Sequence, residues 1–269
     1  MAIPLNFQDN LTEFEQAIIS AMERRSQHKV PVNPKLGTLY VIGTPIGDVD
    51  GITLRAINTL KKVAIVAAET PLVATAVLSQ YAIHTRVTSY GPRHLHEKIA
   101  VLITELKRGV DIALVSDSGM PVIYDPGCAL IHAAHEAGLS VKVIAGPSAL
   151  TAAVALAGYS GDRILFEGRL PRTKQGLRKF LTRLRHEGRT TVLFVEAHRS
   201  ADILTALVST MPRRAVALTI NMERPHETVL RGRPRSVLEM LTRQKVLGKA
   251  TLVIKGIASK KRNQSSARR

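Results

Sequence analysis

From Gly37 onwards, short apolar β-branched segments alternate with helix-length amphipathic segments, and this alternation constrains the fold more than any other feature. The predicted strands lie at residues 38–42, 63–68, around 87, 112–115 and 141–144. The predicted helices between them lie at residues 52–60, 71–81, 96–107 and 129–137. Strands that alternate with helices of this length form βαβ units with parallel strand pairing. The pattern therefore predicts an α/β domain around a largely parallel sheet.

A polar break at residues 158–162 precedes a second predicted unit. Its predicted strands lie at residues 164–166, 190–195, 215–219, 227–230 and 251–254, and its helices at 173–186, 199–209 and 236–242. The strands at 215–219 and 227–230 follow one another without a helix, which favours a mixed or antiparallel sheet. The expected organisation is a helical extension and linker (1–36), an N-terminal α/β domain (37–158), a C-terminal α/β domain (159–257) and a basic disordered tail (258–269).

Residues 1–36 differ in pattern from the rest of the chain. Asn10 with Glu13 resembles a capping box, and apolar residues follow at helical spacing. Pro31 and Pro34 then indicate a stiff linker. We expect an amphipathic helix that docks on this protein or on a partner subunit.

The charge of the chain favours a polyanionic partner. Lys+Arg number 38 against 21 Asp+Glu, a net charge of +17, and the basic tail from Ser259 accounts for five of these charges. Between residues 169 and 199, nine Lys and Arg stand against two acids. Neutralising phosphates with such residues releases counterions, which favours RNA as the partner; a generally basic proteome is the alternative explanation. With five Phe and five Tyr, we expect RNA contacts mainly to phosphate and sugar.

Several functional classes are excluded or disfavoured. A single cysteine, Cys128, rules out an intrachain disulfide and a multi-cysteine metal site, and suits a reducing compartment. No apolar run approaches the roughly 20 residues of a membrane span. The N-terminus lacks a basic-then-apolar signal segment. We therefore expect a cytoplasmic protein with no membrane and no metal.

Loops follow four of the predicted strands, at residues 43–48, 68–70, 116–121 and 145–148, and three of them are rich in Gly and Pro. In parallel sheets, ligands bind beyond the carboxyl ends of the strands, so these loops are expected to form one site. No phosphate-binding P-loop and no dinucleotide-binding glycine motif is present. Gly43 and Gly47 let the backbone approach a ligand closely. Asp125 with Pro126 predicts the start of the next helix.

Five motifs in order carry a resemblance to a known family. They are residues 39–47 (LYVIGTPIG), 113–121 (ALVSDSGMP) with 125–127 (DPG), 146–149 (GPSA), 166–172 (FEGRLPR) and 194–199 (FVEAHR). With these motifs the chain resembles the tetrapyrrole (uroporphyrin/precorrin) methylase superfamily. Within it, the chain is most similar to the ribosomal RNA small subunit methyltransferase I family, which methylates a cytidine ribose 2′-oxygen in 16S rRNA. The resemblance implies two α/β domains with S-adenosylmethionine in the cleft between them, and a homodimer.

The resemblance also implies site residues. The expected cofactor-binding residues are Gly43, Thr44, Pro45, Gly47, Asp48, Ser116, Asp117, Ser118, Gly119, Met120, Pro121, Pro147 and Ser148. A ribose hydroxyl needs a proton acceptor, and the candidates are Glu69, Asp117, Glu196 and His198. The expected RNA-binding residues are Arg169, Arg172, Lys174, Arg178 and Lys179.

Three segments depart from the family pattern. Glu69-Thr70-Pro71-Leu72 stands where the family has Glu-Asp-Thr-Arg, and Ile220-Asn221 stands where it has Arg-Glu. The segment after Ser89-Tyr90 lacks the His-x-His-Asn-Glu pattern. Two alternatives follow: a relative that binds RNA or ribosomes without turnover, and a tetrapyrrole C-methyltransferase, which Asp48 favours.

Overall fold

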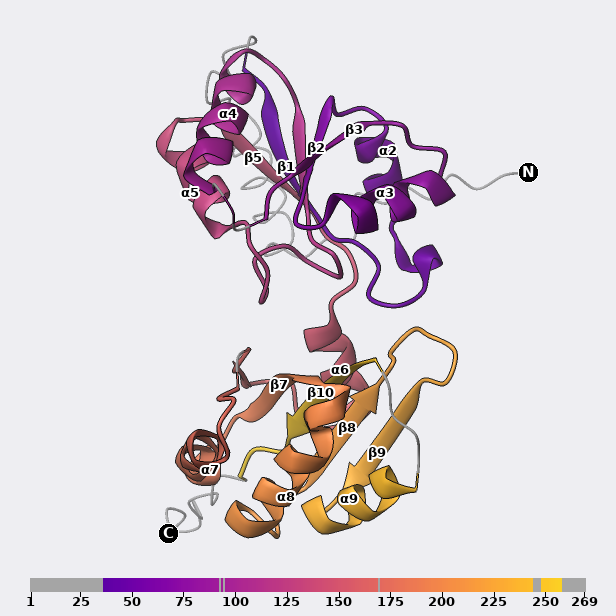
Figure 1. Ribbon diagram of the computed structural model, residues 1–269, viewed down its shortest axis with the longest axis vertical. Helices are drawn as coiled ribbons and strands as arrows, with labels where there is room; N and C mark the ends of the chain where they lie inside the picture. The colour runs from indigo at the N-terminus through magenta and orange to yellow at the C-terminus, as the bar shows by residue number, and fades with distance from the viewer. Residues whose placement is uncertain (1–35, 92, 94, 169, 244–247, 258–269) are drawn as a thin grey trace, which may run out of the picture.

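The computed structural model describes residues 36–91, 93, 95–168, 170–243 and 248–257. The predicted N-terminal helix, the basic tail and Arg169 lie outside these residues. The described part contains two sheets, each with its own helices, and α6 lies at the junction between them (Figure 1). None of the helices in the described segments combines the length and the apolar character that crossing a bilayer demands.

The first sheet is parallel and has helices on both faces. Its strands are β1 (Thr38–Ile42), β2 (Ile65–Ala68), β3 (Arg86–Ser89), β4 (Ile112–Val115) and β5 (Ser140–Ile144), in the order β3-β2-β4-β1-β5. Helices α2 (Leu54–Leu60) and α3 (Pro71–Gln80) pack on one face, and α4 (Leu95–Lys107) and α5 (Cys128–Glu136) pack on the other. Strands β2 and β4 are buried along their whole length, because both faces of the sheet are covered.

The second sheet is mixed. Its strands are β6 (Ile164–Phe166), β7 (Thr190–Glu196), β8 (Val216–Ile220), β9 (Thr228–Gly232) and β10 (Lys249–Ile254), in the order β6-β7-β10-β8-β9. Strands β6 and β7 are parallel, and the other pairs are antiparallel. Helices α7 (Lys174–Arg183), α8 (Ser200–Thr210) and α9 (Pro234–Thr242) cover one face. The predicted α/β class, a parallel sheet followed by a mixed sheet, is confirmed.

Helix α6 (Ala149–Ala157) is absent from the sequence prediction. Its residues are mostly alanine and are apolar all round, so no amphipathic period marks it. Ala153, Val154 and Ala157 pack against strands of the second sheet, and these small side chains let the helix lie close to it. The domain boundaries remain predictions, but this packing favours a division before α6 rather than after Gly158.

Helix α5 begins within one residue of the predicted range of 129–137, but not at the Asp125–Pro126 pair that signalled its start. Its first residue is Cys128 and its N-cap is Gly127, so Asp125 and Pro126 do not start the helix. Gly127 has φ of 142° and offers no side chain to cap the first turn. The backbone N–H of Leu130, in that first turn, instead donates to the hydroxyl of the fully buried Tyr90 at 3.1 Å. A side chain distant in sequence therefore caps this helix.

We expect Tyr90→Phe to lower the free energy of unfolding by about 1–3 kcal/mol, because it leaves the buried Leu130 N–H without an acceptor. Urea unfolding followed by circular dichroism measures the change. Tyr81→Phe is the matched control, since its hydroxyl donates to the Val49 carbonyl at 2.6 Å at an exposed position where water substitutes. Equal losses in the two variants would contradict the capping role of Tyr90.

Candidate active site

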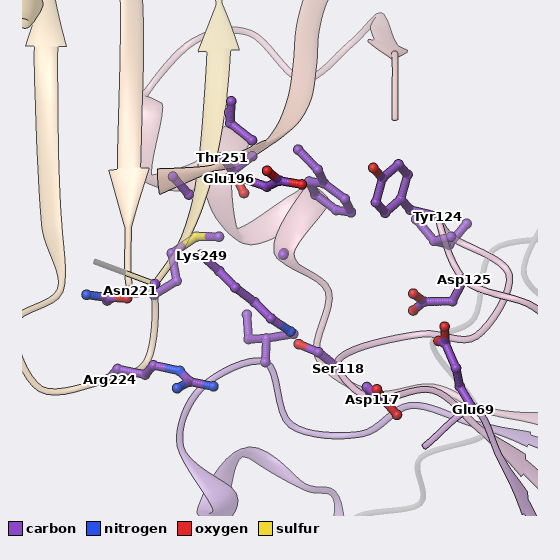
Figure 2. A pocket seen from close by; sticks show the side chains of 18 residues that line it. Glu69, Asp117, Ser118, Tyr124, Asp125, Glu196, Asn221, Arg224, Lys249 and Thr251 are labelled. Atoms are coloured by element: carbon purple, nitrogen blue, oxygen red, sulfur yellow. The ribbon is translucent and has the colours of Figure 1, made fainter. Parts of the chain in front are cut away.

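A cavity of about 380 Å³ lies between the two sheets. Loops after β1, β2 and β4 form one side of it, and the ends of β7, β8 and β10 form the other. Its volume falls within the range of roughly 300–1,000 Å³ that small-molecule sites occupy. The lining residues are Ile46, Glu69, Asp117, Ser118, Ile123, Tyr124, Asp125, Ala149, Phe194, Val195, Glu196, Asn221, Met222, Arg224, Gly248, Lys249, Ala250 and Thr251 (Figure 2).

The loops after β1 and β4 are joined by an isolated antiparallel bridge between Thr44 and Gly119. The Thr44 N–H donates to the Gly119 carbonyl at 2.9 Å, and the Gly119 N–H donates to the Thr44 carbonyl at 3.2 Å. The hydroxyls of Thr44 and Ser116 are buried and also donate to carbonyls of these loops, at 3.1 Å and 2.9 Å. These polar groups hold the two loops together below the cavity.

Glycines permit three close backbone approaches around the cavity. A Cβ on Gly43 would lie 2.8 Å from the Cα of Gly146, which brings the loops after β1 and β5 together. A Cβ on Gly47 would overlap the carbonyl oxygen of Met222 in the second domain. On the other side of the cavity, a Cβ on Gly168 would lie 2.6 Å from the Tyr124 ring. The last two contacts set the separation of the domains at the site.

Three carboxylates from the first domain, Glu69, Asp117 and Asp125, form what we call the acid wall of the cavity. Asp117 is tied to the start of α3, because its two oxygens accept from the backbone N–H of Thr70 at 3.1 Å and from the Thr70 hydroxyl at 2.7 Å. Partial burial and the neighbouring charge of Asp117 raise the pKa of Glu69 above its ordinary value. Burial and the charge of Glu69 raise the pKa of Asp125 to about 6.

Two cations from the second domain, Arg224 and Lys249, form the opposite, basic wall. Figure 2 shows the Lys249 side chain extended across the cavity toward the loop that carries Asp117 and Ser118. The positive charge of Lys249 acts on both Glu69 and Asp125, where it opposes part of the rise in their pKa values. The cavity therefore has three carboxylates on the first domain and two cations on the second, which also contributes the carboxylate of Glu196.

The loops that present these groups are strained. Val122 and Tyr124 have φ of 76° and 71°, and Asn221 and Glu223 have φ of 54° and 56°. Positive φ is a genuine outlier for a β-branched residue such as Val122. Residues held in such conformations cluster at functional sites, where the surrounding structure enforces them.

The predicted proton acceptors divide into two groups. Glu69, Asp117 and Glu196 line the cavity, whereas His198 lies outside the lining. The Nε2 of His198 lies 3.2 Å from Glu196, and the two side chains are 77% and 68% exposed. The structure thus brings Glu69 and Asp117 together and leaves His198 in solvent beside Glu196.

Of the predicted cofactor-binding residues, Asp117 and Ser118 line the cavity. The others lie outside its lining: Gly43, Thr44, Pro45, Gly47, Asp48, Ser116, Gly119, Met120, Pro121, Pro147 and Ser148. Asp48 is exposed and caps the short helix at Val49–Gly51, accepting from the backbone N–H of Asp50 at 3.0 Å. Its side chain is committed to that turn.

The predicted RNA-binding residues that the structure describes, Arg172, Lys174, Arg178 and Lys179, are all exposed at or near α7. The Arg199 guanidinium donates to the Pro171 carbonyl at 2.6 Å, which anchors the loop before α7 to the start of α8. These cations lie on the surface of the second domain and not in the cavity.

Sequence reasoning missed Tyr124, Asp125, Asn221, Arg224 and Lys249 as members of the site. Asn221 had a signal, because it falls in a segment that departs from the family pattern. Lys249 had none, since a lysine at the start of a strand is ordinary. Among the described residues, no group of three His, Cys, Asp or Glu is arranged to hold a metal ion.

Comparison with known proteins identifies the family. A sequence profile of the family described as Tetrapyrrole (Corrin/Porphyrin) Methylases matches residues 38–237. A Thermotoga maritima protein named Ribosomal RNA small subunit methyltransferase I is 36% identical over 221 residues, covering 82% of this chain and 99% of that protein. A protein of the same name from Escherichia coli O157:H7 is 35% identical over 204 residues, covering 76% of this chain and 71% of that protein.

A solved structure supports the fold. The cobalamin biosynthetic enzyme cobalt precorrin-4 methyltransferase matches with a TM-score of 0.62 at 18% identity, covering 81% of this chain and 94% of that one. The resemblance predicted from the five motifs is confirmed. The chain therefore belongs to the tetrapyrrole (corrin/porphyrin) methylase family and is a methyltransferase that uses S-adenosylmethionine as the methyl donor.

Proposed function

We propose that this protein methylates ribosomal RNA of the small subunit, at the ribose 2′-oxygen of a cytidine. The observation that carries the proposal is the match, over about four fifths of the chain, to proteins named for methylation of that RNA. The surface charge supports it, because four exposed cations lie at or near α7. The expected homodimer and cytoplasmic location remain predictions.

The residues of the cavity fit S-adenosylmethionine. Its sulfonium and ammonium groups are cations that suit the acid wall, and its carboxylate suits the basic wall. Asp117, Ser118, Met222, Ala250 and Thr251 are the lining residues that we propose hold it. When bound, the cofactor supplies a methyl group on a sulfur that is already a good leaving group. Gly43 and Gly146 keep the loops beneath it compact, since a Cβ on either would collide with the other loop.

The remaining task of the protein is to place the acceptor hydroxyl. A well-aligned acceptor and donor gain several kcal/mol over free encounter. Tyr124 lines the cavity and is 47% exposed, and the centroid of its ring lies 5.8 Å from that of Phe194 in an edge contact. Its ring therefore offers a face on which a nucleobase stacks. Unstacked bases of RNA are commonly held against aromatic side chains, so an aromatic residue beside the cavity suits an unstacked cytidine.

Two other functions are less well supported. The tetrapyrrole alternative depended on Asp48, whose side chain caps a short helix outside the cavity lining. The inactive alternative depended on the altered segments, yet Thr70 in one of them donates twice to Asp117 and so organises the acid wall. At least one altered segment therefore helps to organise the charged cavity.

The direct test is ribose-methylation mapping. Small ribosomal subunits from a strain that lacks the gene are incubated with the protein and S-adenosylmethionine, and digested rRNA is analysed by mass spectrometry. We expect one new 2′-O-methylcytidine. Methylation on another nucleoside or on a base would correct the acceptor, and no transfer to any rRNA would reject the proposal.

We expect Gly47→Ala to weaken S-adenosylmethionine binding by at least about tenfold, a loss of roughly 1.4 kcal/mol. The added Cβ collides with the Met222 carbonyl and moves the second domain away from the first. Isothermal titration measures the Kd, and thermal melting establishes that the variant is folded. Gly161→Ala is the control, since its Cβ would make an ordinary contact at 3.6 Å from Val154. An unchanged Kd in Gly47→Ala would show that this contact does not shape the cofactor site.

A second prediction concerns the exposed cations of α7. The double substitution Arg178→Gln, Lys179→Gln is expected to reduce the slope of log K against log salt for rRNA by about 1.4 to 1.8, since each phosphate contact contributes about 0.7–0.9. Fluorescence anisotropy with a labelled 16S rRNA fragment measures the slope, and the Kd for S-adenosylmethionine should not change. Lys61→Gln, Lys62→Gln removes two exposed cations from the first domain as a charge-matched control. Equal slopes for both doubles would remove α7 from the RNA interface.

A further inference from the structure

Methyl transfer to a hydroxyl requires a group that takes the hydroxyl proton. The structure argues against three of the four acceptors predicted from the sequence and adds Asp125 to the carboxylates at the cavity. Each oxygen of Asp117 already accepts one hydrogen bond from Thr70, so this carboxylate positions the start of α3. Glu196 lines the cavity, but its side chain is 68% exposed and lies 3.2 Å from the exposed His198, where water competes for any proton. Glu69 and Asp125 are therefore the two remaining candidates among the carboxylates of the cavity.

Asp125 is the more constrained of the two. It lies in the segment between β4 and α5, yet it does not cap α5, whose N-cap is Gly127 and whose first turn is capped by Tyr90. The backbone just before it is held at positive φ at Val122 and Tyr124. Tyr124 in turn contacts the second domain, where its ring lies against the backbone of Gly168 and makes an edge contact with Phe194. Strain and packing thus fix Asp125 at the cavity rather than at the helix end where sequence statistics would place it.

We propose that Asp125 is a catalytic residue, the proton acceptor for the substrate hydroxyl, with Glu69 and Lys249 as positioning residues that tune it. This assignment rests on the proposed function. The hydroxyl oxygen forms a bond to the methyl carbon as the carbon–sulfur bond breaks, the sulfur keeps that electron pair and becomes a neutral thioether, and the hydroxyl proton passes to an Asp125 carboxylate oxygen. Asp125 is half-buried, so it returns the proton to solvent when the product leaves.

The surroundings of Asp125 suit this role at neutral pH. Burial and the charges of Glu69 and Asp117 raise its pKa, while the Ser116 hydroxyl and Lys249 oppose the rise, with a resulting pKa of about 6. The Ser116 hydroxyl also lies 2.9 Å from the Gly119 carbonyl, so its single proton can serve either acceptor. A base is most effective when its pKa lies near the working pH while it remains unprotonated, and a carboxylate of ordinary pKa is a weaker base.

The pH dependence of kcat, with cofactor and rRNA saturating, tests the assignment. The wild-type rate should rise with pH along an acid limb at or below about 6, since a bound sulfonium lowers the pKa of a nearby carboxylate. Asp125→Asn should lower kcat by about 10²–10⁴ and abolish the limb. Asp162→Asn, at an exposed acid whose side chain accepts from Ser160, is the control and should leave the profile unchanged.

The positioning residues give opposite shifts that a merely structural role would not produce. Glu69→Gln removes a negative charge that raises the pKa of Asp125, so the acid limb should move to lower pH. Lys249→Gln removes a positive charge that lowers it, so the limb should move to higher pH. If Glu69 were the acceptor, Glu69→Gln would instead abolish the limb while Asp125→Asn kept it, which would overturn the assignment.

Thermal stability provides a readout that does not depend on turnover. The pKa of Asp125 is raised from 3.8 to about 6 in the folded protein, so ionisation of Asp125 costs stability as the pH rises through this window. Asp125→Asn should therefore raise Tm at pH 7.5, and the difference should vanish below about pH 4. A lower Tm at pH 7.5 would mean that the carboxylate supports the fold and would overturn the assignment.

The failure of this assignment is distinguishable from failure of the proposed function. Wild-type transfer to rRNA that Asp125→Asn retains within threefold rejects Asp125 and leaves the function standing. No transfer to rRNA by the wild type rejects the function and this assignment together.

Discussion

Two glycines, Gly47 and Gly168, allow the two domains to come into close contact at the cavity. At Gly47 the loop after β1 touches the Met222 carbonyl, and at Gly168 the start of the second domain touches the Tyr124 ring. These contacts lie on opposite sides of the cavity, so together they set both its width and its alignment. A Cβ on Gly47 would press on the backbone of the second domain and change the distance between the charged groups of the two walls, whereas a Cβ on Gly168 would displace the Tyr124 ring.

The charges across the cavity depend on that alignment. The acid wall comes from loops at the carboxyl ends of parallel strands, where a parallel sheet gathers its polar residues. The basic wall comes from the turn after β8 and from the first residue of β10, in an antiparallel part of the second sheet. The acid wall belongs to the first domain and the two cations to the second, so a zwitterionic ligand is matched where the two domains face one another.

Much of the fold follows from the sequence because its signals are local. Strand and helix periodicity, and the glycine and proline loops after the strands, locate the parallel sheet and one rim of the site. The sequence does not predict helix α6, because a helix made largely of alanine has no alternation of polar and apolar residues at helical spacing. The sequence does not predict Lys249 and Asp125 as site residues, because they are far apart in the chain. Lys249 begins β10 of the second domain and Asp125 precedes α5 of the first, and only the packing of the two domains brings their charges together.

The segment from Val122 to Gly127 shows how a sequence rule fails for a physical reason. Asp-Pro ordinarily starts a helix, since the carboxylate caps the first turn and the proline fits the first position. Here the Tyr90 hydroxyl accepts from the Leu130 N–H in the first turn, so the Asp125 carboxylate does not cap the helix. A half-buried carboxylate beside Glu69 is unfavourable for folding, because burial and like charge both oppose its ionisation. A fold that accepts this cost, together with positive φ at Val122 and Tyr124, holds a base where a substrate hydroxyl must lose its proton.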